Sequence, residues 1–325
     1  NPYQYSSLIE VTGAFSCSAP LQTTFCSTTD IDLTSTLSAN KYQWQLNTGS
    51  GFVNINDNTN YSGTNSNTLH ISNIPSSWYD YQYRCLADGI NDNVFVLQFK
   101  NTWTGSVSTS RENSANWSCG TVPTDSTDVL IPAGTVNASI ITTTAQSKNL
   151  MIATGASLIV NSNGILQLHG DLLNNGAFED NGTLDIAGND NVTIPGGTYT
   201  NLKISGGNIL NIDAPLTTTG NLDLINGKIF LGDNDFTIGN AGTITNQSSS
   251  SYFVINGTGK LIQNNIGSGG KSGNIIFPVG TSSQSYTPLT LNNALGAADN
   301  FSISMSDGVY SNYSGFNPIG SPLNS

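Results

Sequence analysis

Residues 201–238 read NLKISGGNILNIDAPLTTTGNLDLINGKIFLGDNDFTI, and this stretch repeats one short pattern. Two apolar residues flank a central residue in triplets such as Leu202-Lys203-Ile204, and turn residues such as Gly206-Gly207 lie between the triplets. Alternation of this kind, bounded by turn residues, is typical of short β-strands that bury one side.

The same pattern recurs from Ser147 onward within the segment 101–247, and two architectures account for it. Asn-Gly pairs such as Asn163-Gly164 are a hairpin signal, so a meander of hairpins is one alternative. We favour a β-solenoid (β-helix), because the strands are too short for stable two-stranded hairpins and are evenly spaced. Three strands of ~8 residues would make a coil of ~24 residues, with the apolar residues stacked in one column. Asn and Thr at equivalent turns are expected to form hydrogen-bonded ladders along that column.

The composition of the whole chain narrows the class further. Of its 325 residues, 9% are charged and 37% are hydrophobic, and the formal net charge is −12. Phosphate binding needs clustered cations, so the sequence predicts no nucleic-acid partner. Strong helix formers are scarce, and no apolar run approaches the ~20 residues of a membrane-spanning helix. We therefore predict an all-β chain with no membrane insertion.

The first segment, residues 1–100, predicts an immunoglobulin-like β-sandwich. Six or seven short strands fall within its ~100 residues, as in that fold. Trp44 is the expected buried tryptophan, and Tyr83 lies two positions before Cys85, which is the spacing of a tyrosine corner. On this interpretation Cys26 is the disulfide partner of Cys85.

Both ends of the solenoid predicted in the central segment are expected to be covered by other parts of the chain. Trp103 and Trp117 lie near its start and no further tryptophan follows, which predicts a Trp-rich cap at the N-terminal end of the solenoid. From residue 248 the strands lengthen, and Tyr and Phe return. Because an open solenoid end must be covered, residues 248–325 are predicted to form a small sandwich-like cap that ends in a linker.

The four cysteines show no CxxC spacing and no Cys/His cluster, which argues against a zinc site. An even number of cysteines in an Asn/Thr-rich, Lys-poor chain predicts disulfides in an oxidising, extracellular setting. Four free buried thiols remain the alternative.

One set of motifs resembles a known family. Trp103-Thr104-Gly105, the run ANWSCGTVP at residues 115–123 and DVLIP at residues 128–132 resemble a motif of large secreted surface proteins of Bacteroidota. In that family the motif opens a β-helical segment, and residues 42–45 and 83–85 look like the family's immunoglobulin-like repeats. The resemblance implies export by the type IX secretion route to the outer cell surface. Members of the family serve as adhesins, gliding-motility proteins or non-catalytic parts of secreted enzymes.

The chain departs from the family in two places. A C-terminal sorting domain is usual in the family and none is visible here, so it has been cleaved or the chain is a fragment. Many relatives also carry a cysteine where this chain has Ser147. The resemblance therefore leaves Cys119 without its usual partner and suggests a bridge to Cys17, with a free or intermolecular thiol as the alternative.

A β-helix raises the question of polysaccharide lyase or hydrolase activity. A lyase needs a base, with arginine or calcium to bind carboxylates, but Arg84 and Arg111 lie outside the repeating coils. Lys203 and Lys228 are expected to point outward from their strands. His169 stands alone, and we find no paired-aspartate motif of the glycosidase kind. We predict that the chain is not an enzyme.

Two further sites follow from local sequence. Turn carboxylates at Asp233, Asp235, Glu179 and Asp180 offer oxygen ligands for calcium, with Asx turns as the alternative. No other cofactor is expected. Ser126, in Asp125-Ser126-Thr127, fits a short pattern that Bacteroidota glycosylate on the hydroxyl.

These observations favour a non-catalytic, extracellular structural or adhesive segment of a secreted bacterial cell-surface protein. Its partners are expected to be glycans or surfaces. A variant of this hypothesis is assembly into filaments, with the Tyr3–Val11 stretch added as a strand to a neighbouring copy. The alternative for this stretch, which we favour, is that it forms the first strand of its own sandwich. The alternative is a carbohydrate-binding, non-catalytic part of a secreted polysaccharide-degrading enzyme, for which Trp78 and Tyr79 are the candidate aromatic pair.

Overall fold

The computed structural model describes residues 21–306 and 310–322, except residues 28, 208, 315 and 316. The chain is all-β, with 48% of residues in strands and 2% in helices. It divides into two compact units, Asn1–Gln98 and Phe99–Ser325. The described residues include no helix long and apolar enough to cross a membrane.

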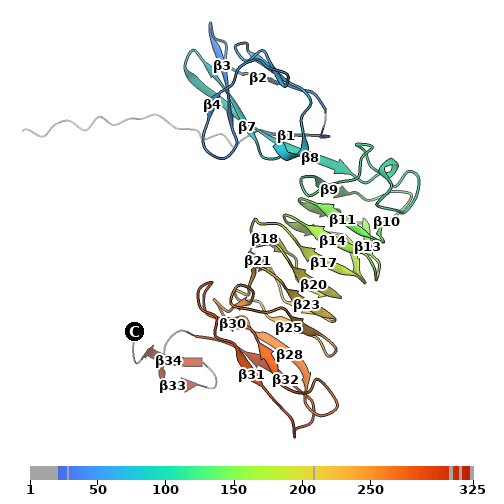
Figure 1. Ribbon diagram of the computed structural model, residues 1–325, viewed down its shortest axis with the longest axis vertical. Helices are drawn as coiled ribbons and strands as arrows, with labels where there is room; N and C mark the ends of the chain where they lie inside the picture. The colour runs from blue at the N-terminus through green and yellow to red at the C-terminus, as the bar shows by residue number, and fades with distance from the viewer. Residues whose placement is uncertain (1–20, 28, 208, 307–309, 315–316, 323–325) are drawn as a thin grey trace, which may run out of the picture. The chain divides into compact units, whose positions relative to one another are not determined.

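The first unit is built of short antiparallel strands (Figure 1). Strands β4, β3, β7 and β8 follow one another in one sheet, in which β1 also pairs with β8, and strands β2, β6 and β5 form a second sheet. The bounds are β1 (Leu21–Phe25), β2 (Ile31–Thr34), β3 (Tyr42–Asn47), β4 (Val53–Asn54), β5 (Tyr61–Ser62), β6 (Thr68–Ile71), the 3₁₀ helix η1 (Ser76–Trp78), β7 (Gln82–Ala87) and β8 (Ile90–Thr102).

Trp44 and Tyr83, both predicted as core residues, are fully buried in this unit. The Trp44 indole N–H donates to the Ser66 carbonyl at 2.9 Å, and the hydroxyls of Tyr83 and Tyr61 lie 3.0 Å apart. Both polar groups therefore keep hydrogen bonds inside an apolar core, which removes the main cost of burying them.

The second unit begins with a cap in which the predicted tryptophans meet. Trp103 and Trp117 are buried, and their rings pack edge to face with centroids 5.2 Å apart. The Trp103 indole donates to the Asn137 carbonyl and the Trp117 indole to the Arg111 carbonyl. The 3₁₀ helix η2 (Ser114–Asn116) lies in the same segment. The two tryptophans thus form a buried, hydrogen-bonded pair in the segment that precedes β9.

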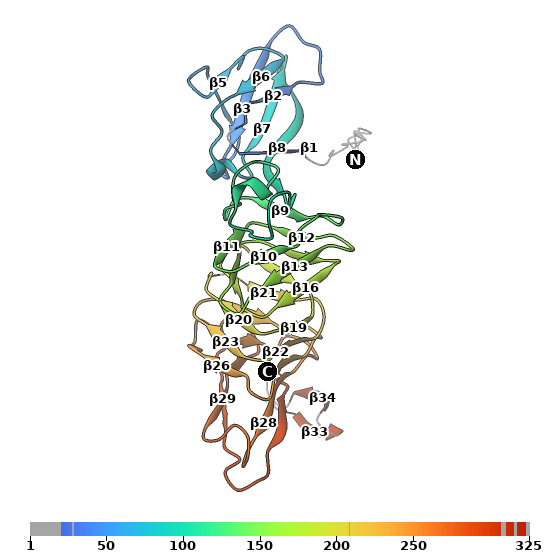
Figure 2. The same cartoon turned by 90° about the vertical axis from the view of Figure 1, so that its right-hand side faces the viewer.

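From β9 onward the chain forms a β-solenoid of about 6 turns, as predicted. Its strands stack in parallel on three faces, as Figure 1 shows for β11 to β23 and Figure 2 for β10 to β22. The third face is one six-stranded sheet. The first face holds β9 (Asp128–Ile131), β12 (Leu150–Ile152), β15 (Leu172–Asn174), β18 (Val192–Ile194), β21 (Ile209–Ile212), β24 (Lys228–Phe230), β27 (Phe253–Val254) and β30 (Val279–Gly280); the second holds β10 (Ser139–Ile141), β13 (Ser157–Val160), β16 (Ala177–Asp180), β19 (Gly197–Tyr199), β22 (Leu216–Thr218), β25 (Phe236–Ile238) and β28 (Leu261–Ile266); the third holds β11 (Thr144–Ser147), β14 (Ile165–Leu168), β17 (Thr183–Ile186), β20 (Asn201–Ile204), β23 (Asn221–Leu224) and β26 (Thr243–Thr245).

The register of these sheets places apolar side chains one above another inside the column. On the third face Leu166 aligns with Leu184, Leu184 with Leu202, and Leu202 with Leu222, and all four are completely buried. A single turn has no second layer to bury this face, so each turn depends on its neighbours for its core.

Most turns are shorter than the sequence predicts, although the last ones reach the predicted length, with 25 residues from Phe236 to Leu261. Gln146, Gln167 and Asp185 occupy one position of successive turns and are separated by 21 and 18 residues, against the expected ~24. The strands are three or four residues long and tight turns join them, so each face uses fewer residues than the sequence suggests. The same length of chain therefore makes more turns.

The expected polar ladders also form at the turns. Asn201 donates from Nδ2 to the Gly182 carbonyl at 2.9 Å, and its Oδ1 accepts from the Asn221 N–H at 2.9 Å. Asn221 in turn accepts from the Thr243 hydroxyl at 2.9 Å. Each side chain satisfies backbone or side-chain groups of the adjacent turn, which explains why Asn and Thr are frequent in this chain.

The parallel ladder runs past Gln247, where the sequence predicts that the solenoid ends. Strand β27 pairs with β24, β28 with β25, and β30 with β27, all in parallel. Antiparallel pairing then replaces the ladder, because β28 also pairs with β32. The remaining strands are β29 (Ile275–Phe277), which pairs with β31 (Leu289–Leu291), then β32 (Asp299–Ile303), and β33 (Tyr310–Ser314), which pairs with β34 (Asn317–Pro322).

We expect that Leu202→Ala destabilises the second unit by about 2–5 kcal/mol, because it leaves a cavity between two stacked leucines. The matched control is Thr193→Ala on the exposed centre of β18, which we expect to change stability by less than about 0.5 kcal/mol. Denaturant unfolding measures both. Equal effects of the two substitutions would contradict the stacked-column description.

Candidate functional site

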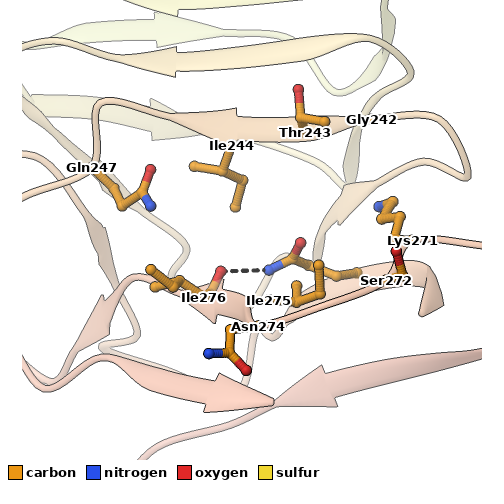
Figure 3. Close-up of a pocket in the computed structure, with 10 residues that line it drawn as sticks. Gly242, Thr243, Ile244, Gln247, Lys271, Ser272, Asn274, Ile275 and Ile276 are labelled. Carbon is orange, nitrogen blue, oxygen red and sulfur yellow. Dashed lines mark hydrogen bonds between the residues drawn. The ribbon is translucent and has the colours of Figure 1, made fainter. Parts of the chain in front are cut away.

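The third face of the solenoid ends before the other two, and a cavity lies at that place. Strand β26 is the last strand of this face, whereas the first and second faces continue through β27 and β28. A cavity of about 330 Å³ opens beside β26 (Figure 3). Thr243, Ile244, Gln247, Gln263, Lys271 and Ile276 are among the residues that line it.

Lys271 supplies the one titratable side chain of the cavity lining. Its Nζ atom is buried and has no hydrogen-bond partner among the described residues. Removal of the ammonium from water lowers the pKa of Lys271 to about 8. No acidic residue lines the cavity in the described part of the chain. The site therefore holds a cation that lacks a counter-charge.

The backbone around Lys271 is fixed by a glycine-rich turn. The Lys271 N–H donates to the Asn265 carbonyl at 2.6 Å, and its carbonyl accepts from the Gly267 N–H at 2.8 Å. Gly267 has φ +137°, a conformation that L side chains rarely adopt, and a Cβ on Gly270 would lie 2.2 Å from the Asn265 carbonyl oxygen. Glycine is thus required for the fold that presents Lys271 to the cavity.

Gln247 and Gln263 provide the amide groups of the cavity. The Gln247 Oε1 atom is buried and has no hydrogen-bond partner among the described residues. Gln263 is only 3% exposed and donates from Nε2 to the Ile276 carbonyl at 2.7 Å, the bond drawn as a dashed line in Figure 3. This hydrogen bond fixes the part of the cavity wall that Ile276 forms. One buried donor group and one buried acceptor are therefore left for a partner inside the same cavity.

Sequence reasoning did not identify this cavity. The available signal is the run Gly269-Gly270-Lys271-Ser272-Gly273, in which a lysine stands among glycines in a chain that has few lysines. That run does not reveal that the third face lacks a further strand, because the pairing partners are far apart in the sequence.

The predicted disulfide between Cys26 and Cys85 is wrong. Cys26 and Cys119 are both disulfide-bonded, whereas Cys85 is a free thiol with a completely buried side chain. Cys85 lies opposite Trp44 in the β3–β7 ladder, whereas Cys26 lies just beyond the end of β1. Burial raises the pKa of the Cys85 thiol. Cys17, the predicted partner of Cys119, lies outside the described residues.

Three of the four residues proposed for calcium bind the backbone of the next turn instead. Asp233 accepts from the Thr258 N–H at 3.0 Å, and Asp235 accepts from the Lys260 N–H at 2.9 Å. Asp180 accepts from the Thr200 N–H at 2.9 Å, and the Glu179 side chain is exposed on β16. Over the described residues, no group of three or more His, Cys, Asp or Glu side chains is placed to hold a metal ion. This arrangement favours the turn-stabilising alternative.

Other residues of interest from the sequence lie apart from the cavity. Ser126 is half-buried and donates to the Asp125 carboxylate at 3.0 Å. His169 has a buried Nε2 atom with no hydrogen-bond partner in the described chain, and burial lowers its pKa. Neither residue is among those that line the cavity.

A polar ladder runs along the outward side of the third face. Gln146 donates to Gln167 and Gln167 to the Asp185 carboxylate, each at 3.2 Å. Lys203 also contacts Asp185 at 3.2 Å, and the Ser205 hydroxyl donates to it at 2.6 Å. Asp185 is completely buried under these neighbours. Its charge is therefore satisfied within the ladder.

Comparison with known proteins adds one finding. A family model described as a domain of unknown function (DUF8693) matches residues 102–193, which span the Trp-rich cap and the first turns of the solenoid. No curated protein and no solved structure matches the chain significantly.

We expect that Lys203→Met destabilises the second unit by about 1–3 kcal/mol, because it removes the cation from a buried carboxylate. Lys203 is partly exposed, so the loss stays below that of a fully buried pair. Lys228→Met, which removes a contact with the Ser250 carbonyl, is the control and should cost less. Urea unfolding measures the stability of both variants. Recovery of stability by Asp185→Asn in the Lys203→Met background would support the loss of the ion pair as the cause.

Lys271 should make stability depend on pH. The unfolded lysine has a pKa near 10.5 and the folded one a pKa of about 8, so the unfolded chain binds more protons between these values. The free energy of unfolding should therefore rise as the pH increases from about 8 to 10.5. Lys271→Met should lack this rise and be at least as stable as the parent at pH 7. Denaturant unfolding over this pH range measures the free energy of unfolding of the parent and of Lys271→Met. Lys260→Met, at an exposed site, is the control. A rise that persists in Lys271→Met would assign it to another group.

Proposed function

We propose that this chain is a non-catalytic structural and adhesive segment of a secreted bacterial cell-surface protein. The observation that carries the proposal is the parallel ladder of about 6 turns, whose three faces share one apolar column. Such a column resists bending, because each turn is hydrogen-bonded and packed against the next. A scaffold of this kind suits a protein that holds contacts at a distance from a cell.

The disulfide-bonded cysteines support an extracellular location. Cys26 and Cys119 are oxidised, and disulfides persist in oxidising compartments and are rare in reducing ones. The motifs that resemble Bacteroidota surface proteins point the same way, with export by the type IX route as part of the proposal. The turn carboxylates and amides are largely used between turns, which leaves a surface of few charges and many hydroxyls.

We also propose finer assignments for the two ends. The first unit fits an immunoglobulin-like domain, because it has two sheets of short strands, a buried Trp44 and a hydrogen-bonded Tyr83. The antiparallel β28–β32 and β29–β31 pairs fit a cap that closes the solenoid.

The alternative function, a carbohydrate-binding part of a secreted enzyme, has less support from the aromatic residues. The Trp78 ring stacks with both Tyr61 and Tyr81, with centroids 5.6 and 5.7 Å apart. A ring engaged in two stacks offers little free face to a sugar. The cavity beside β26 is the feature that supports glycan binding.

Electron microscopy of the purified full chain tests the structural proposal and its filament variant. We expect extended particles that join into filaments if the Tyr3–Val11 stretch, which lies outside the described residues, pairs with a neighbouring copy. Deletion of residues 1–11 should then abolish the filaments and leave single particles. Filaments that survive the deletion would exclude strand donation by this stretch.

A second readout tests the absence of catalysis. The chain should be retained on polysaccharide-coated surfaces without releasing reducing ends from the polysaccharide. Time-dependent release that is lost on heat denaturation would overturn the non-catalytic assignment.

A further inference from the structure

We propose that the cavity beside β26 binds the hexuronate unit of an acidic polysaccharide, with the sugar carboxylate at Lys271 Nζ and a sugar hydroxyl at Gln247 Oε1. This inference names a ligand class for the adhesive function proposed above, and rests on that function only for its biological role.

The need for an anion follows from Lys271. A buried ammonium without a partner is costly, and a carboxylate that reaches it removes most of that cost. The three lysines of the repeating coils provide a contrast. Lys148 pairs with Asp190 and Lys203 with Asp185, and Lys228 donates to the Ser250 carbonyl. Lys271 is directed instead into a cavity without acidic lining, although the chain as a whole carries a net charge of −12.

The need for a hydroxylated ligand follows from Gln247. Its buried carbonyl oxygen requires a donor, which a carboxylate or a simple anion such as chloride does not supply. Thr243 also lines the cavity, and because its hydroxyl donates to Asn221, its oxygen can still accept from a sugar hydroxyl. A sugar acid carries both the anion and the hydroxyl donors on one ring, whereas a fatty acid carries only the first.

The size and the walls of the cavity fit one sugar ring. Its volume of about 330 Å³ lies at the lower end of the range for ligand sites, which is roughly 300–1,000 Å³. Ile244 and Ile276 give it apolar walls against which the C–H face of a pyranose can pack. Figure 3 shows Lys271 and Gln247 on different sides of the space, with the isoleucines between them. Because Lys271 Nζ and Gln247 Oε1 are both closed to solvent, their side chains must rotate toward the space before a ring that spans the cavity can contact both groups.

The cavity results from the way in which the fold ends. The inward side of the third face is occupied by Leu202, Leu222 and then Ile244, and in the part of the chain that the structure describes no seventh strand of this face covers Ile244. The segment that carries Lys271 closes over the opening only partly, so a site with one buried cation remains at the end of an apolar column.

Isothermal titration of the full chain at pH 7 with methyl β-glucuronide tests the proposal. We expect saturable binding, and binding at least about tenfold weaker for methyl β-glucoside, which lacks the charge. N-Acetylalanine, a carboxylate without sugar hydroxyls, should also bind at least about tenfold more weakly. Equal binding of the glucoside would overturn the role of the carboxylate, and equal binding of N-acetylalanine would overturn the assignment to a sugar.

Two variants and one control locate the site. Lys271→Met and Gln247→Leu should each weaken glucuronide binding about tenfold or more, whereas Lys260→Met should leave it unchanged. Thermal unfolding of each variant checks that it folds. Undiminished binding by both variants, or no saturable binding by the parent, would overturn the proposal.

The pH dependence gives an independent readout. Lys271 is the one titratable group that lines the cavity in the described chain, so glucuronide affinity should fall about tenfold per pH unit well above pH 8. Affinity that does not change up to pH 10 would contradict the ammonium–carboxylate contact.

Failure of this inference and failure of the proposed function can be told apart. If the parent and Lys271→Met are retained equally on a uronate-rich polysaccharide surface, adhesion stands and this site is wrong. If glucuronide binds at Lys271 while the chain is not retained on any polysaccharide surface, the site stands and the adhesive function is wrong.

Discussion

The parallel register of the solenoid is the constraint on which the second unit depends. Each turn is too small to bury its own apolar residues, so Leu184, Leu202 and Leu222 are buried only because the turns above and below align with them. A shift of one residue in one strand would turn these side chains outward and expose the column. The ladders of Asn, Asp and Thr at the turns also favour this register, because their hydrogen bonds form between turns only when the turns are aligned in this way.

An open column would expose apolar residues at each end, and the chain covers the two ends in different ways. At the start, Trp103 and Trp117 cover the column and bond their indole groups to backbone carbonyls. At the far end, two faces continue into β27 and β28, while the third stops at β26. This unequal ending leaves Ile244 partly uncovered beside Lys271. A candidate binding site thus appears where the repeat ends, and not on the repeat itself.

The acidic residues of the solenoid serve the same architecture. Most acidic side chains of the solenoid that we describe accept hydrogen bonds from a neighbouring turn, as Asp180, Asp233 and Asp235 do. Asp185 is buried by its own ladder partners. Carboxylates used in this way stabilise the turns, which is the alternative to the calcium site that their spacing in the sequence suggests.

The sequence alone determined the all-β class, the solenoid, the buried Trp44, Tyr83, Trp103 and Trp117, and the polar ladders, because these depend on local alternation, turn residues and side-chain type. It did not determine the length of a turn, since tight turns and three-residue strands look much like longer ones. Nor did it determine the disulfides: Cys85 has the expected spacing from Tyr83 and is nonetheless a free thiol. The cavity at Lys271 was decided by tertiary structure only, because Thr243, Gln247, Gln263 and Ile276 meet Lys271 through strand pairing at the end of the ladder. Such pairing joins residues whose separation along the chain carries no signal of its own.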